Sequence, residues 1–185
     1  MRYIVKEFDK PLLIFSADMN SSNSNLQIEK IYEENDAFFP LNLTVSNGGL
    51  ESWLKHRVIP KNRAYVDALL SKTGLSANRP LGIIAVCKGL SLNDCYWVDS
   101  ADNESSFAKV NLYDNRFSTI LASIAFTGYG SSVRSSLFSS PEFSTNGMLP
   151  KCWRRINGKI YLYKGGTSGF SNTGFEPYSE LYAYQ

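Results

Sequence analysis

Two lysines and a polar turn form the part of this sequence that is best suited to chemistry. The turn leads to Lys151, and a second lysine, Lys164, ends a stretch of alternating residues over 159–164. Hydroxyl, amide and ammonium groups donate hydrogen bonds to phosphate oxygens, and a glycine lets the main chain approach a ligand closely. The layout is therefore suited to holding nucleotide phosphates. The turn residues that would contact them are Ser144, Thr145, Asn146 and Gly147.

Two simpler interpretations of the same residues remain open. One glycine does not make a phosphate-binding loop, the patterns GxxxxGK(S/T) and GxGxxG are absent, and an ordinary β-hairpin turn over 144–151 fits the spacing. Lys164 lies on the same strand face as Ile160 and Leu162, where core residues are expected, so its ammonium needs an anionic partner. Glu180 on a following helix is a candidate partner, unless Lys164 is a surface lysine that extends into water.

Length, charge and cysteine content limit the possible function classes. The chain has 185 residues, enough for one compact domain or two small ones, and its net charge of +2 indicates neither a nucleic-acid nor an anionic-membrane partner. Three cysteines and one histidine make neither a disulfide framework nor a zinc site. Neither a signal peptide nor a run of transmembrane length is present. We therefore expect a cytoplasmic protein with no membrane partner and no metal ligands of its own.

Hydrophobic periodicity and turn residues predict an α+β protein. The aromatic content of 14% favours several strands. The apolar run 81–87 fits either a buried strand or a helix, and Asn47-Gly48-Gly49 favours a turn. Tyr65 is expected to face the core. Strands are expected within 2–16, near 37–46, up to Val98 and over 159–164, and helices over 50–58, 62–72, 117–126 and from Pro177 onward.

A stretch rich in glycine and serine, residues 128–140, is the best candidate for a domain boundary. It divides the chain into an N-terminal accessory region of strands and helices, residues 1–135, and a shorter C-terminal unit, residues 136–185. The helical pair before it is basic, with Lys55, His56, Arg57, Lys61 and Arg63. A solvated face explains these charges, although a DNA-reading helix-turn-helix is the alternative.

Three blocks of the sequence resemble HipA-related proteins, which are serine/threonine kinases of toxin–antitoxin type. The blocks are 89–98, 110–118 and 145–153, the last continued by 161–166, and the similarity is greatest to variants from Gram-positive bacteria. The resemblance covers at least residues 50–185. It implies that residues 136–185 form part of a protein-kinase-like small lobe, with antiparallel strands and a helix, that binds ATP.

The resemblance also implies a role for each residue of the turn and for the two lysines. Residues 144–151 would form a flexible phosphate-binding loop, Lys164 would contact ATP, and Glu180 would position that lysine. Ser144 occupies the place of a serine that family kinases autophosphorylate, and its phosphorylation would expel the loop by repulsion. The sequence departs from better-known relatives in Asn146-Gly147-Met148-Leu149-Pro150, whose bulky residues and proline leave the loop conformation open.

Phosphoryl transfer further needs a catalytic Asp, a metal-binding Asn and a second metal-binding Asp. The only histidine, His56, is followed by Arg57 and Val58, so no His-Arg-Asp loop exists here. We therefore expect an N-terminal fragment of an ATP-dependent kinase with no catalytic residues of its own. Magnesium would be held by a missing C-terminal lobe, and the partners would be ATP, that lobe, and an antitoxin or protein substrate.

Two other functions remain open at this point. The chain could be a non-catalytic, antitoxin-like or regulatory module that docks on a separately encoded kinase. It could also be a small nucleic-acid binder that uses the basic segment 55–63.

Overall fold

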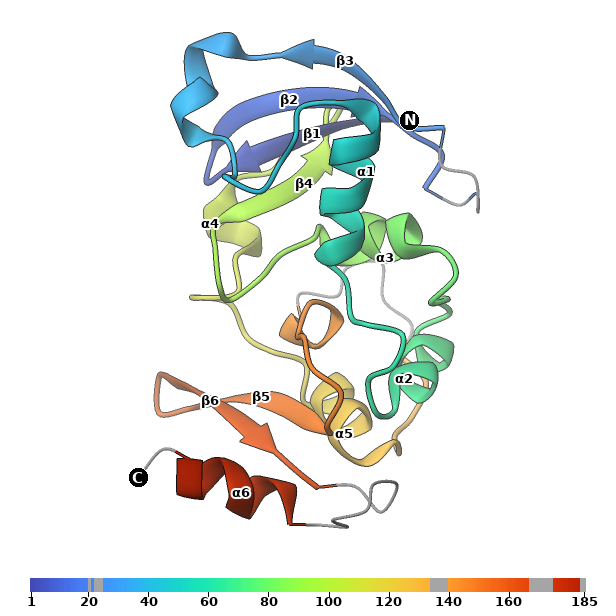
Figure 1. The fold of residues 1–185 in the computed structure, drawn as a ribbon, viewed down its shortest axis with the longest axis vertical. Helices are drawn as coiled ribbons and strands as arrows, with labels where there is room; N and C mark the ends of the chain where they lie inside the picture. Colours follow the sequence, from blue (N-terminus) through green and yellow to red (C-terminus); the bar gives the residue numbers. More distant parts are fainter. Residues whose placement is uncertain (20, 22–24, 134–139, 167–174, 184–185) are drawn as a thin grey trace.

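The structure is a computed structural model that describes residues 1–19, 21, 25–133, 140–166 and 175–183. The chain forms an α+β fold with two antiparallel sheets. In Figure 1 the four-stranded sheet and the two-stranded sheet lie at opposite ends of the long axis, with helices between them. Among the described residues, none of the helices combines the length and the apolar character that crossing a bilayer requires.

The four-stranded sheet has the strand order β3-β2-β1-β4, and all its pairings are antiparallel. The predicted strands within 2–16 and up to Val98 are confirmed. The strands are β1 (Arg2–Glu7), β2 (Lys10–Ser16), β3 (Gln27–Ile31) and β4 (Tyr96–Ser100).

The extended run expected near 37–46 is wrong. The 3-10 helix η1 (Glu33–Phe38) is followed by an irregular loop, and Leu41 is fully exposed. A strand at 37–46 cannot pair with the free edge of β2, because β3 already pairs with it. β3 was not predicted, because four of its five side chains are exposed and its pattern carries no buried face.

Helix α1 (Asn47–His56) begins where the sequence favours a turn. The Ser46 hydroxyl accepts a hydrogen bond from the Gly49 amide at 3.1 Å, so serine caps the helix and the glycines form its first turn. The expected buried stripe, Leu50, Trp53 and Leu54, faces the core.

Two of the remaining helices in this half agree with the predicted ranges 62–72 and 117–126, although the first begins only at Val66, and the short helix at 107–110 was not predicted. The run 81–87 is helical, with a proline at its first position. Tyr65 is 42% exposed rather than buried, because it takes a left-handed conformation before the helix and packs on Gly128. The helices are α2 (Val66–Lys72), α3 (Pro80–Cys87), α4 (Phe107–Val110) and α5 (Thr119–Thr127).

The C-terminal part is a β-hairpin followed by a helix. Asn157 and Gly158 form the hairpin turn with φ of 49° and 78°, the left-handed pair that tight hairpins require. The polar loop at 144–150 is therefore not a hairpin turn, since it connects a 3-10 helix to the first strand of this hairpin. The elements are η2 (Pro141–Phe143), β5 (Lys151–Ile156), β6 (Lys159–Lys164) and α6 (Glu176–Ala183).

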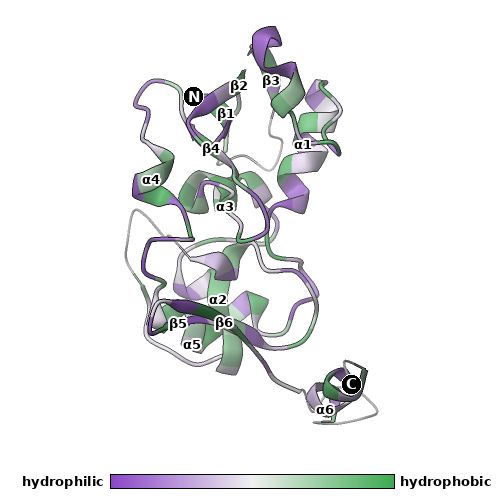
Figure 2. Ribbon diagram, turned by 90° about the vertical axis from the view of Figure 1, so that its left-hand side faces the viewer, coloured by the Kyte–Doolittle hydropathy of each residue, from purple (hydrophilic) through white to green (hydrophobic). Residues whose placement is uncertain are grey.

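One main core joins the sheet to the helices. It contains Leu13, Leu54, Leu69 and Ile84, and it also takes in Phe143, which is fully buried. Figure 2 shows the strongly hydrophobic character of α3 and α5, which lie inside this assembly. A second, smaller cluster lies around Trp97 and is completed by Leu90, Phe107 and Leu112. Residues on both sides of position 135 thus contribute to the main core, which positions η2 and the loop after it.

Candidate functional site

Five of the seven predicted ligand-binding residues line one cavity of about 310 Å³. They are Ser144, Thr145, Asn146, Lys151 and Lys164. The other two lie beside it, since Gly147 contacts the Lys151 side chain and Glu180 pairs with Lys164. The cavity is completed by Ser91, Leu92, Asn93, Pro141, Trp153 and Leu162.

The two lysines reach the cavity because their strands are paired. Lys151 begins β5 and Lys164 ends β6, and the two residues are direct cross-strand partners. Cross-strand partners direct their side chains to the same face of the sheet. Lys164 forms an ion pair with its candidate partner, Glu180 of α6, but it is exposed and not on the buried face that the alternating pattern predicts. Both groups are partly exposed, with side-chain exposures of 36% and 41%.

The ammonium group of Lys151 lies in a crowded and electropositive position. Its Nζ donates a hydrogen bond to the Asn146 carbonyl at 2.9 Å. Gly147 has a φ of +90°, which favours glycine, and a Cβ there would displace this Nζ, the mobile end of the lysine side chain. The pKa of Lys151 is lowered by burial first, and then by the positive charges of Arg63 and Lys164. A bound anion would relieve that repulsion.

Arg63 anchors the loop from inside the protein. Its Nη1 donates to the carbonyls of Glu142 at 3.1 Å and Thr145 at 3.2 Å, and its Nη2 donates to the Lys151 carbonyl at 2.6 Å. One guanidinium therefore joins the beginning and the end of the loop. The Ala64 amide adds a bond to the Met148 carbonyl at 2.7 Å. The loop that the resemblance describes as flexible is held in place here at both ends and in its middle.

Glu142 is the buried partner of this arginine. Its Oε2 lies 3.3 Å from Arg63 Nη2, and its Oε1 accepts the Trp153 amide hydrogen at 2.8 Å. Both side chains of the ion pair are fully buried. Burial raises the pKa of Glu142 to about 7, although the Trp153 amide and Arg63 act in the opposite direction. Sequence reasoning missed this pair, because no local pattern links two residues 79 positions apart.

The two hydroxyl groups of the loop differ in how firmly they are held. Thr145 Oγ1 donates to the Pro141 carbonyl at 2.6 Å and accepts from Trp153 Nε1 at 2.8 Å. Ser144 Oγ makes a longer bond of 3.4 Å to the same carbonyl. The Thr145 hydroxyl is thus committed to structure, whereas Ser144 can reorient toward a ligand at lower cost.

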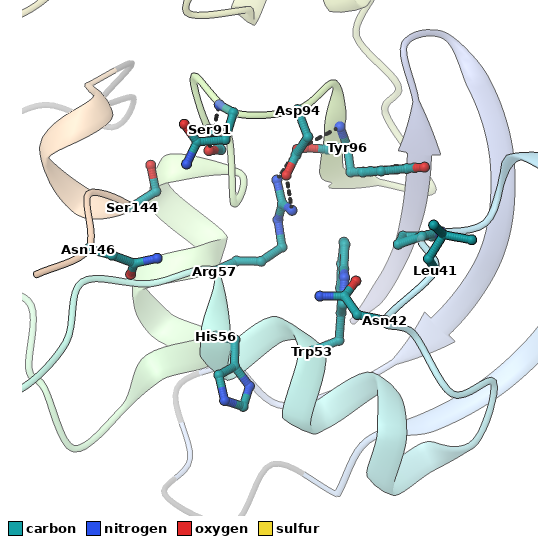
Figure 3. A pocket seen from close by; sticks show the side chains of 12 residues that line it. Leu41, Asn42, Trp53, His56, Arg57, Ser91, Asp94, Tyr96, Ser144 and Asn146 are labelled. Carbon is teal, nitrogen blue, oxygen red and sulfur yellow. Dashed lines mark hydrogen bonds and ion pairs between the residues drawn. The ribbon is translucent and has the colours of Figure 1, made fainter.

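A second cavity of about 370 Å³ adjoins the first, and Figure 3 shows it from close by. Ser144 and Asn146 face it from the loop, and Trp53 and His56 border it from α1. The two cavities share the wall formed by Ser91, Asn93, Ser144 and Asn146.

Arg57 forms a structural ion pair at the edge of this second cavity. Its Nη1 and Nη2 donate to the two Asp94 oxygens at 2.9 and 2.7 Å, and its Nε donates to the Gly89 carbonyl at 2.9 Å. Arg57 and Arg63 are only 9% and 2% exposed. The basic segment 55–63 therefore directs two of its five basic side chains inward, which leaves a weaker face for nucleic-acid phosphates.

The arrangement directs two lysines and polar loop residues into one cavity, but the described part of this protein offers little for metal chemistry. Among the residues that the structure describes, no three His, Cys, Asp or Glu side chains lie close enough together to hold a metal ion. Comparison with family models, with curated proteins and with solved structures found no match. The assignment of this site therefore depends on its geometry and on the sequence blocks described above.

Proposed function

We propose that this chain supplies the phosphate-binding part of an ATP site in a HipA-like serine/threonine protein kinase. The observation that carries the proposal is the pair of lysines on cross-strand positions, directed into one cavity with a polar loop. The volume of about 310 Å³ lies at the lower end of the range for small-molecule pockets, about 300–1,000 Å³. Such a volume suits the phosphate part of a nucleotide better than a whole nucleotide.

Each group would have a distinct part in holding the phosphates. Lys164, oriented by Glu180, would neutralise one phosphate group, and Lys151 a second. Ser144 and the Asn146 amide would donate hydrogen bonds. The magnesium ion bound with ATP would neutralise further charge, held by residues of a C-terminal lobe that this sequence does not contain. The chain alone would not catalyse transfer to a protein hydroxyl.

Ser144 would also serve as the regulatory phosphorylation site. A phosphate there adds between about 1.5 and 2 negative charges beside the fully buried carboxylate of Glu142. Its residue is only 9% exposed, so the modified side chain would have to leave its position. The loop would then move with it, which closes the phosphate site to ATP.

Calorimetric titration with ATP and magnesium tests the proposal. The titrations compare this chain, and a form extended by its downstream sequence, with their Lys164→Ala variants. We expect Lys164→Ala to weaken binding by at least about tenfold, the effect of one lost charge-assisted hydrogen bond. Lys159→Ala is the matched control, since Lys159 is an exposed lysine at the other end of β6. If the extended protein binds no nucleotide, or Lys164→Ala leaves binding intact, the assignment fails.

A specific observation favours the alternative, a non-catalytic module that docks on a separate kinase. The C-terminal helix exposes Tyr178, Leu181 and Tyr182 by 63%, 60% and 79%, and β6 exposes Tyr161 and Tyr163 by 45% each. Aromatic residues of this kind are enriched in protein interfaces. The gene context separates the two functions. A reading frame that continues into an Asp/Asn catalytic loop favours the kinase fragment, and an adjacent gene for a complete kinase favours the module.

A further inference from the structure

A third cavity lies beside β5 and the start of α5, and three arginines line it. Its volume is about 240 Å³, and the arginines are Arg116, Arg154 and Arg155. The other lining residues are Phe117, Ser118, Thr119 and Trp153. We propose that this cavity binds a phosphate dianion, either free or as a monoester, at a site separate from the two-lysine cavity.

The charge of the three arginines is only weakly compensated, since Arg154 is near enough to Glu142 to lower the pKa of that carboxyl. Among the described residues, none of the three forms an ion pair with a carboxylate. The buried carboxylate on this side of the sheet, Glu142, already pairs with Arg63. Guanidinium groups are always charged and present planar, forked donors that match phosphate oxygens. Three of them around one small cavity create a field that favours a doubly charged anion over a singly charged one.

Arg155 is held in place before any ligand binds. Its Nη2 donates to the Leu112 carbonyl at 3.0 Å and to the Asn115 carbonyl at 3.3 Å, and its guanidinium lies over the Phe117 ring at 5.1 Å. Its Nε is buried without a hydrogen-bond partner within the described structure. The Arg155 side chain is thus held in one position, whereas Arg116 and Arg154 can adjust their side chains to donate hydrogen bonds to the anion.

The arginines, and not the end of α5, give the cavity its character. The Ser118 hydroxyl accepts the Leu121 amide hydrogen at 3.2 Å, so the helix start is already capped by its own side chain. The volume of about 240 Å³ is below that of pockets for drug-sized ligands, about 300 Å³ and more. The cavity therefore suits a phosphate group with a few neighbouring atoms better than a whole nucleotide.

Trp153 separates this cavity from the two-lysine cavity. It lines both, while no other residue is shared between them. The two anion sites therefore use different cations, Lys151 and Lys164 on one side and the three arginines on the other. This separation makes the two proposals independent of each other in an experiment.

The test is a titration of the full chain with inorganic phosphate at constant ionic strength, followed by calorimetry and by amide chemical shifts in two-dimensional NMR. We expect saturable binding that perturbs the amides of residues 116–119 and 153–155, with acetate at the same concentration producing much smaller shifts. Arg154→Ala is expected to weaken phosphate binding by about tenfold, since hydrogen bonds to charged groups contribute about 1.5–3 kcal/mol. Lys159→Ala removes the same charge from the same hairpin, outside the cavity, and should leave binding unchanged.

A second set of variants keeps the proposal falsifiable. Arg116→Ala alters an exposed residue outside any helix or strand and should weaken binding even if Arg154→Ala disturbs folding. Titration with O-phospho-L-serine separates the two sources, because tighter binding than inorganic phosphate identifies a monoester ligand and weaker binding identifies free phosphate. The proposal is overturned if Lys164→Ala weakens phosphate binding as much as Arg154→Ala does. It is equally overturned if acetate binds as well as phosphate.

Discussion

At the scale of single residues, the loop at 144–150 depends on an arginine that does not line the two-lysine cavity. Arg63 comes from the segment between α1 and α2, and its guanidinium holds the carbonyls of Glu142, Thr145 and Lys151. Its charge is balanced by the Glu142 carboxylate inside the protein. Lys151 and Ser144 therefore keep their positions only while this buried ion pair is intact.

Arg63→Ala is expected to destabilise the protein by about 3–5 kcal/mol, because it leaves the buried Glu142 carboxylate without its counter-ion. Urea unfolding followed by circular dichroism measures the change in the free energy of unfolding. Arg2→Ala is the control, since Arg2 forms an ion pair with Glu29 in which its side chain is 51% exposed, and it should change stability little. A loss below about 1 kcal/mol for Arg63→Ala would contradict the structural role of the buried pair.

The buried carboxylate also predicts how stability depends on pH. The pKa of Glu142 is raised from 4.5 to about 7 in the folded state, mainly by burial, so the folded protein binds this proton more tightly than the unfolded chain does. The stabilisation that this tighter proton binding gives to the folded protein is fully present below pH 4.5, and it is lost as the pH rises through about 7. We expect Glu142→Gln to flatten that part of the pH profile, measured by urea unfolding at several pH values. An unchanged slope between pH 4.5 and 7 would show that Glu142 titrates normally.

At the scale of elements, the first turn of α1 shows how a loop-like sequence becomes a helix. Glycines weaken a helix, and Asn47-Gly48-Gly49 favours a turn by itself. The cap from Ser46 and the buried face of Leu50, Trp53 and Leu54 outweigh that preference. The two glycines, however, have different surroundings.

Gly48→Ala and Gly49→Ala are therefore expected to have opposite effects. A Cβ at Gly48 meets nothing within 4 Å, so alanine should stabilise the helix by up to about 1 kcal/mol. A Cβ at Gly49 would clash with the Thr44 carbonyl oxygen and the Thr44 side chain, so alanine there should destabilise the protein. Thermal unfolding of the two variants beside wild type measures both changes. Equal shifts in the same direction would mean that the Thr44 contact does not constrain this turn.

Elements with a strong apolar pattern could be predicted from the sequence, and several elements without one, though not all, were missed. β1, β2, α1 and α5 bury continuous or periodic hydrophobic residues, which local sequence reveals. The exposed strand β3 and the 3-10 helix at 33–38 owe their conformation to neighbours supplied by the rest of the fold.

The candidate site was predictable to the same degree. Lys151 was predicted from the polar turn, and Lys164 with its candidate partner Glu180 from strand alternation, and the three residues are found together. The pair of Arg63 and Glu142 could not be predicted from the sequence, since only the folded chain brings the two residues into contact.

At the scale of the whole molecule, one core connects the four-stranded sheet with the segment that carries the loop at 144–150. Phe143 is fully buried in the main core, and its carbonyl accepts the Ile59 amide hydrogen at 2.6 Å. α5 packs against β5 as well as against α2. The hairpin and the sheet should therefore lose their structure together, because the segment after position 135 buries Phe143 in the core that the rest of the chain forms.

Phe143→Ala tests this cooperativity. Removing a fully buried aromatic ring should cost about 3–5 kcal/mol, which lowers the protection of every segment that depends on the shared core. Hydrogen exchange by mass spectrometry compares peptides from β1 and from β5, and we expect both to lose protection by the same free energy. Phe175→Ala, at a ring that is 65% exposed, is the control and should leave both peptides unchanged. If only the β5 peptide loses protection, the hairpin unfolds as a separate unit, and the loop is positioned by local contacts instead of by the common core.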